Sequence, residues 1–156
     1  MDDRDPLLQV PAAELTAHQA PALLVERVAT LQSDGGAVEL SAHQGLDGLQ
    51  LLEACAQAVA VLTGARMRSC GDGQAASGML VGAKAFTVLR CARPGERVRV
   101  DATLTHELGP VQLHVVSARG EDRDVVIGDI GDIGVLGSPG AALAHGELKV
   151  VRTGAP

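Results

Sequence analysis

The sequence is almost without aromatic side chains: of its 156 residues one is Phe (Phe86), and none is Trp or Tyr. Positive charge is also scarce, because 13 Lys and Arg stand against 19 Asp and Glu, a formal net charge of −6. Nucleic-acid binding needs a basic face for phosphates and, for single strands, aromatic rings for stacking. The two shortages therefore argue against a nucleic-acid partner, and the core must be built from Ala, Val and Leu.

Cysteine and long apolar runs are equally sparse. The three cysteines, Cys55, Cys70 and Cys91, form no CxxC pair, so we expect neither a disulfide framework nor a metal site. Cys55 stands among apolar residues and is expected to be a small core residue. No stretch approaches about 20 uninterrupted apolar residues, and residues 1–10 are acidic, unlike a signal peptide. We therefore expect a cytoplasmic protein with no membrane segment.

The length suits one domain. We expect a loose arm over residues 1–10 and a single domain over residues 11–156, with a Gly-rich insertion at 124–140. Turn residues separate the elements, as in Ser33-Asp34-Gly35-Gly36. The expected elements are a short helix at 11–17, a hairpin of 22–31 and 37–42, and strands at 78–90, 97–107, 111–119 and 143–152.

The most distinctive segment is an apolar helix predicted from Asp47 to Thr63. Asp47 is a good N-cap, Gln50 stands three residues later as in a capping box, and Gly64 is a natural residue just past the end. Before Thr63 the polar side chains are Gln50, Glu53 and Gln57, at i, i+3 and i+7, on one narrow stripe. Such a helix should be buried on nearly all sides, with its polar stripe facing something specific.

The order of elements predicts an α+β fold, in which one antiparallel sheet wraps around one long central helix. The strands do not alternate with helices, so a doubly wound parallel sheet is excluded. The strands after the helix should follow one another as a meander. A sheet that covers one face of an apolar helix leaves the other face exposed, so we expect a symmetric dimer.

Four segments resemble the hotdog-fold β-hydroxyacyl-[acyl-carrier-protein] dehydratases, in the same order and over roughly residues 13–120 and the last strand. They are HQAPALLVERV at 18–28, GLQLLEACAQ at 48–57, LVGAKAF at 80–86 and RPGERVRV at 93–100. The closest similarity is to the dehydratase-like proteins of aryl-polyene and related lipid or polyketide pathways.

The resemblance implies a hotdog fold and a dehydratase, or lyase, of fatty acid or polyketide-type biosynthesis. The substrate would be a 3-hydroxyacyl thioester on the phosphopantetheine arm of acyl carrier protein, or a CoA thioester. Elimination of water would give the 2-enoyl thioester, with no metal or organic cofactor. The site would lie at a dimer interface, in a homodimer or a heterodimer.

The resemblance also implies site residues. Glu53 falls on the family's helix carboxylate, and burial in an apolar helix favours the protonated carboxyl that donates a proton to the departing hydroxyl. Gly48 falls on the glycine at the helix start, where a backbone N–H at the positive end of the helix dipole can polarise the thioester carbonyl. From its position one turn below Glu53, Gln57 is also expected to be a substrate-binding residue, which could orient that carboxylate or a water.

The catalytic histidine is harder to place. His43 is the histidine just before the helix, but the family's histidine lies about four residues further upstream, where this sequence has Glu39. His43 would serve as the base only if the loop is shortened by a deletion. We expect His18 to shape the start of the first strand, and His106, His114 and His145 to be strand residues.

Two other functions remain open. A hotdog acyl thioesterase would use Glu53 as base or nucleophile and would need no histidine. A non-catalytic acyl-binding subunit, paired with an active dehydratase, would explain why this sequence lacks the Gly/Pro-rich loop that follows the catalytic histidine in the family.

Overall fold

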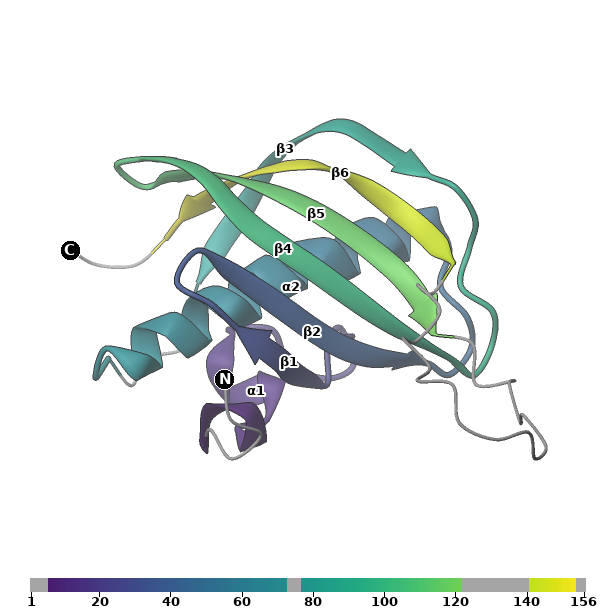
Figure 1. Cartoon of the computed structure of the whole chain (residues 1–156), viewed down its shortest axis with the longest axis horizontal. Coiled ribbons are helices and arrows are strands. Elements are labelled where there is room, and N and C mark those ends of the chain that lie inside the picture. Colours follow the sequence, from purple (N-terminus) through teal and green to yellow (C-terminus); the bar gives the residue numbers. More distant parts are fainter. Residues whose placement is uncertain (1–5, 73–76, 122–140, 154–156) are drawn as a thin grey trace, which may run out of the picture.

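The computed structural model describes residues 6–72, 77–121 and 141–153. Figure 1 shows one antiparallel sheet curved over the long helix α2 (Gly48–Ser69). The strands are β1 (Arg27–Leu31), β2 (Gly35–Ala42), β3 (Gly78–Val88), β4 (Glu96–Leu108), β5 (Val111–Glu121) and β6 (Ala142–Arg152), in the sheet order β1-β2-β4-β5-β6-β3. The expected α+β fold is confirmed, while the Gly-rich segment 124–140 lies outside the described residues.

Helix α2 begins as predicted but is longer. The Asp47 carboxylate accepts from the Gln50 N–H at 2.8 Å, and the Gln50 side chain accepts from the Asp47 N–H at 2.9 Å, which completes the capping box. We expected Gly64 to lie just past the end of the helix. That expectation is wrong, because α2 continues to Ser69. A Cβ on Gly64 would lie 1.8 Å from the carbonyl oxygen of Leu15 in the short helix α1 (Ala12–Leu15), so glycine there permits close packing.

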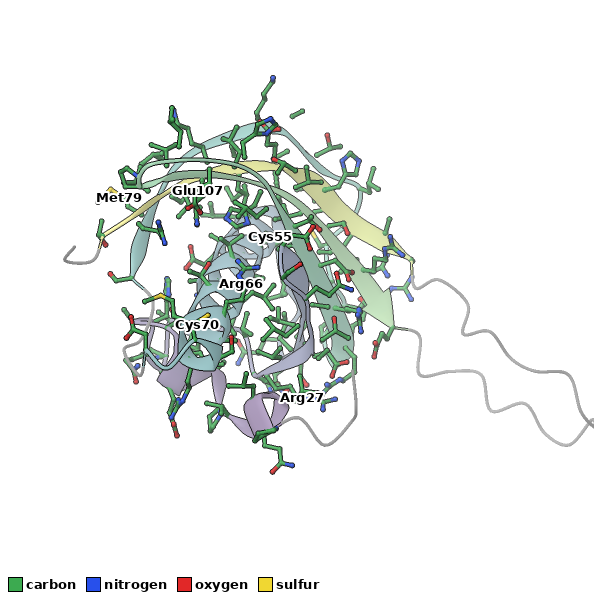
Figure 2. All side chains as sticks on the ribbon, turned by 60° about the vertical axis from the view of Figure 1, so that its left-hand side comes forward. Arg27, Cys55, Arg66, Cys70, Met79 and Glu107 are labelled. Carbon is green, nitrogen blue, oxygen red and sulfur yellow. The ribbon has the colours of Figure 1, made fainter. Side chains whose placement is uncertain are left out.

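By length and composition α2 could cross a membrane, but 61 % of its apolar window is buried inside the fold. That is the arrangement of a core helix. In Figure 2 Cys55 lies between α2 and the sheet. It is fully buried, and burial raises the pKa of its thiol to about 12, as befits the core residue we expected.

The N-terminal arm is not loose where the structure describes it. Pro6–Gln9 form a 3-10 turn, and Leu7, Leu8 and Val10 pack against the core. The expectation of a loose arm is therefore wrong for residues 6–10, because these apolar side chains find a buried surface.

The first hairpin is shifted from its predicted bounds. Strand β1 begins at Arg27, not at residue 22, because the backbone of residues 22–25 is hydrogen bonded to a side chain of α2 instead of a neighbouring strand. Strand β2 begins at Gly35, where a Cβ would lie 2.4 Å from the carbonyl oxygen of Ala102 in β4. Glycine at this position lets the two strands approach.

The strands after α2 do not form a simple meander. β4, β5 and β6 follow one another, but β3 pairs with β6 at the far edge of the sheet. Residues 89–95 cross the end of the sheet: the Leu89 N–H donates to the Leu143 carbonyl at 2.7 Å, and the Ala92 N–H donates to the Leu46 carbonyl at 3.0 Å. Strand β3 is thereby left as an open edge beside α2 (Figure 1).

Candidate active site

The polar stripe of α2 is anchored by Gln57, whose side chain is fully buried. Its Oε1 accepts from the Leu24 N–H at 2.7 Å and, more weakly, from the Val25 N–H at 3.4 Å. Its Nε2 donates to the Ala22 carbonyl at 2.8 Å and to Glu53 Oε1 at 2.9 Å. One amide thus joins the helix, the segment before β1 and the carboxylate of Glu53.

Glu53 is less buried than the sequence led us to expect. Its side chain is 47 % exposed in the single chain, and Leu49, one turn earlier in α2, is 76 % exposed, so this side of the helix is left uncovered by the rest of the chain. The expectation of a buried carboxylate is therefore wrong for this chain alone. The hydrogen bond from Gln57 still fixes one oxygen of Glu53 and so orients the carboxylate.

The histidine beside Glu53 is His18. Its Nε2 lies 3.6 Å from Glu53 Oε1, and its Nδ1 lies 2.8 Å from the hydroxyl oxygen of Thr16. Thr16 is fully buried, and its hydroxyl oxygen also accepts from the His18 N–H at 3.3 Å. The imidazole is therefore held on one side by Thr16 and presents its other nitrogen to Glu53.

His43 does not face Glu53. Its side chain is 84 % exposed, and its Nε2 lies 3.9 Å from Glu26 Oε1. The expected pairing of His43 with Glu53 is wrong within this chain, because the loop after β2 places His43 on the surface beside Glu26. We expected His18 only to shape the start of the first strand. It lies beside Glu53 instead, because it comes just before residues 22–25, whose backbone binds Gln57.

Gly48 is the first residue of α2, and it lies against β3. A Cβ there would come within 3.3 Å of Val88 Cγ2, so a larger residue would crowd β3. Gly48 does not line the cavity that His18 and Glu53 share. Its role in polarising a carbonyl stays a prediction.

His18 and Glu53 lie at a cavity of about 240 Å³ between α2, β3 and β6. Apolar side chains form most of its wall, including Ala56, Val59 and Leu80, and Ser77 and Gln112 add polar groups. An acid/base pair at an apolar cavity suits a substrate with a reactive polar head and an apolar tail. In the part of the chain that the structure describes, no three His, Cys, Asp or Glu side chains are placed to hold a metal ion.

Comparisons with known proteins identify the family and the fold. The family model described as ApeP-like, ApeP dehydratase, matches residues 10–117, a span that includes His18, Glu53 and Gln57. A search among curated proteins finds no match.

Solved structures share the fold at low identity. The dehydratase heterocomplex ApeI:P from Xenorhabdus doucetiae matches with a TM-score of 0.75 and 17 % identity, covering 93 % of this chain and 92 % of that one. The PaaI protein of the E. coli phenylacetic acid degradation operon matches at 0.55 and 14 %, covering 80 % and 81 %. A hypothetical thioesterase with coenzyme A from Streptococcus pneumoniae TIGR4 matches at 0.54 and 11 %, covering 82 % and 85 %. The expected hotdog fold is confirmed.

Proposed function

This chain belongs to the ApeP-like dehydratase family, and we propose that it removes water from 3-hydroxyacyl thioesters of acyl carrier protein to give 2-enoyl thioesters. The observation that carries the proposal is the pairing of His18 with Glu53 at the apolar cavity. The acyl group would be delivered on the phosphopantetheine arm of the carrier.

Elimination needs a base at C2 and an acid at the 3-hydroxyl. Thr16 Oγ1 already accepts from the His18 N–H, and a hydroxyl oxygen has a second lone pair for Nδ1–H. This tautomer leaves the lone pair of His18 Nε2 free to take the C2 proton.

Glu53, in its protonated form, gives its proton to the 3-hydroxyl. The C–H and C–O bonds break, the C2–C3 double bond forms, and water leaves. His18 then carries one extra proton and Glu53 has lost one. Because the two side chains lie 3.6 Å apart, return of the proton from His18 to Glu53 restores the starting state.

Gln57 and Thr16 are positioning residues in this scheme, since each holds one member of the pair by a hydrogen bond of 2.9 or 2.8 Å. The N-terminal N–H groups of α2, at Gly48, would face the thioester carbonyl as the acyl group lies along the helix.

A second subunit is part of the proposal. Large apolar side chains are exposed on β3, on the residue after it and at the start of α2: Met79, Val81, Val88, Leu89 and Leu49. Met79 lies at the rim of the molecule in Figure 2. An open edge strand with such residues favours pairing with another chain. We propose a dimer through β3 that also covers Glu53, in a homodimer or with a related dehydratase subunit as in the ApeI:P heterocomplex.

The test is a turnover assay with 3-hydroxyacyl and 2-enoyl thioesters on acyl carrier protein, following the enoyl absorbance and free thiol. Glu53→Gln and His18→Gln should each lower turnover by about 100-fold or more. His43→Gln is the matched control, because the exposed His43 should leave turnover unchanged. Loss of turnover in His43→Gln with full activity in His18→Gln would overturn the assignment of the base.

A thioesterase is the second candidate, because the half-exposed Glu53 could activate water instead. It would release thiol from the acyl carrier without forming an enoyl product, and His18→Gln would leave that release intact. If neither product forms, the result favours a non-catalytic partner subunit.

A further inference from the structure

The cavity beside Glu53 follows one side of α2. The residues of α2 that line it are Glu53, Ala56, Val59, Ala60 and Thr63. They are separated by three or four residues, the spacing of side chains that share one side of a helix. Ala56 and Ala60 are partly exposed, and their small side chains leave room above the helix. The cavity is therefore a channel along α2 rather than a pocket around Glu53 alone.

The wall opposite α2 is apolar in the middle of the channel. Leu80 of β3 and Val150 of β6 line the channel and pack against the core. Among the described residues that line it, the ionisable ones are His18, Glu53 and Arg152. His18 and Glu53 form the site proposed above, and Arg152 lies at the other end. The space between these two ends suits an apolar chain.

The far end of the channel is polar. Gln112 and Arg152 line both the channel and a second cavity, of about 370 Å³, beside the C-terminal half of α2. Gln112 Nε2 donates to a Glu107 carboxylate oxygen at 2.5 Å, and Gln112 Oε1 lies 3.3 Å from His114 Nε2. The other oxygen of Glu107 lies 3.6 Å from Arg152 Nη2. These contacts hold Gln112 at the junction of the two spaces.

The second cavity does not suit an apolar chain. Four charged side chains line it, two of each sign: Arg66, Arg152, Asp72 and Glu107. In Figure 2 Arg66 and Glu107 lie on the inner side of the curved sheet. An apolar chain that passed Gln112 would displace water from these charges or break the hydrogen bond between Gln112 and Glu107, and either change costs free energy.

We propose that the acyl chain of the substrate lies in this channel, against Ala56 and Ala60, and that the polar groups around Gln112 limit its length. This inference rests on the proposed function, since it places the reacting carbons at Glu53. Ten residues separate Glu53 from Thr63, a rise of about 15 Å along a helix. An extended chain advances about 1.2 Å per bond, so about twelve carbons fit beyond C3 and the limit lies at about fifteen carbons in all.

The experiment measures the binding of S-alkyl coenzyme A thioethers by calorimetry, with unbranched alkyl chains from about 6 to about 18 carbons. The dissociation constant should fall about fourfold for each added methylene while the chain stays within the channel, as expected when a methylene leaves water. Beyond about fifteen carbons each further methylene should change it by less than about twofold. A constant fourfold gain through the longest probe would overturn the inference.

Two variants test where the chain lies. Ala60→Leu narrows the channel three residues before Thr63 and should move the break in affinity to chains about four carbons shorter. Ala56→Leu narrows it seven residues before Thr63 and should move the break by about nine carbons. Leucine is accepted well in helices, so both variants should fold. An unchanged break in either variant, or a larger shift in Ala60→Leu than in Ala56→Leu, would overturn the proposed path.

A third variant tests what ends the channel. Gln112→Ala removes the polar group and opens space, so the break should move to longer chains; an unchanged break would overturn the role of Gln112. Ala13→Leu is the matched control, because Ala13 is an exposed residue of α1 that does not line the channel. Its break should coincide with that of the wild type, and a shift as large as that in Ala60→Leu would contradict the assignment.

The thioethers are not turned over, so the outcome is independent of the reaction. Turnover of 3-hydroxyacyl thioesters without a break in affinity would overturn the length limit alone. A break at the expected length without turnover would leave the length limit standing and overturn the proposed activity.

Discussion

The stability of this protein should depend strongly on Gln57. We consider Gln57→Met, because methionine is unbranched and of similar length but lacks the amide. The substitution removes one acceptor and two donors from a fully buried position. It therefore tests the hydrogen bonds rather than the packing.

The expected loss follows from the partners. The N–H groups of Leu24 and Val25 both donate to Gln57 Oε1 and would lose this acceptor in the variant. Leaving a buried donor without an acceptor destabilises a protein by about 1–3 kcal/mol. Ala22 and Glu53 are exposed, so the Ala22 carbonyl and the Glu53 carboxylate can bind water instead. Losing either hydrogen bond from Gln57 should therefore cost about 1 kcal/mol or less. We expect the free energy of unfolding to fall by about 2 to 4 kcal/mol, a large share of the roughly 5–15 kcal/mol of an ordinary domain.

Urea unfolding measures this change from the midpoint and the slope. Gln44→Met is the matched control, because Gln44 is an exposed residue of the loop before α2, and its replacement should change the free energy by less than about 0.5 kcal/mol. If Gln57→Met costs no more than Gln44→Met, the bonds between α2 and residues 22–25 do not hold the fold as argued.

Three further predictions concern packing, pH and thiol chemistry. Gly64→Ala should lower the melting temperature, although alanine favours helices by about 1 kcal/mol, because its Cβ would lie 1.8 Å from the Leu15 carbonyl; a higher melting temperature would contradict this. Burial lowers the pKa of His114 to about 4, so the unfolded chain binds the proton more tightly. The free energy of unfolding should then fall as pH drops from about 6.5 towards 4, by about 1–3 kcal/mol, and His114→Gln should flatten that slope. The pKa of Cys55 is raised to about 12, so a thiol reagent should modify the two exposed cysteines in the native state and Cys55 only after unfolding.

The sequence by itself determined the elements that depend on local patterns. The start of α2 follows from Asp47 and Gln50, whose capping box needs only four consecutive residues. The later strands follow from alternation bounded by turn residues, and their observed bounds differ by one or two residues from the expected ones. The choice of Glu53 came from its place on the polar stripe and from family resemblance, and neither depends on distant contacts.

Only the tertiary structure decided which histidine stands beside Glu53. His43 is ten residues from Glu53 in sequence and His18 is thirty-five, yet His18 is the neighbour. The reason is Gln57, whose amide binds the backbone of residues 22–25 and so brings the segment before β1 against α2. The spacing of apolar and polar residues in a sequence does not reveal a hydrogen bond between a helix side chain and a distant backbone segment.

The exposure of Glu53 and the edge position of β3 were also decided in three dimensions. An apolar helix sequence indicates burial, but it does not say which face the sheet covers and which face is left for another subunit. Strand β3 looks like its neighbours in sequence, and the crossing of residues 89–95 sends it to β6 rather than to β4. The exposure of Glu53 and the edge position of β3 both depend on which distant segments come into contact after a connection. The local sequence does not encode those contacts.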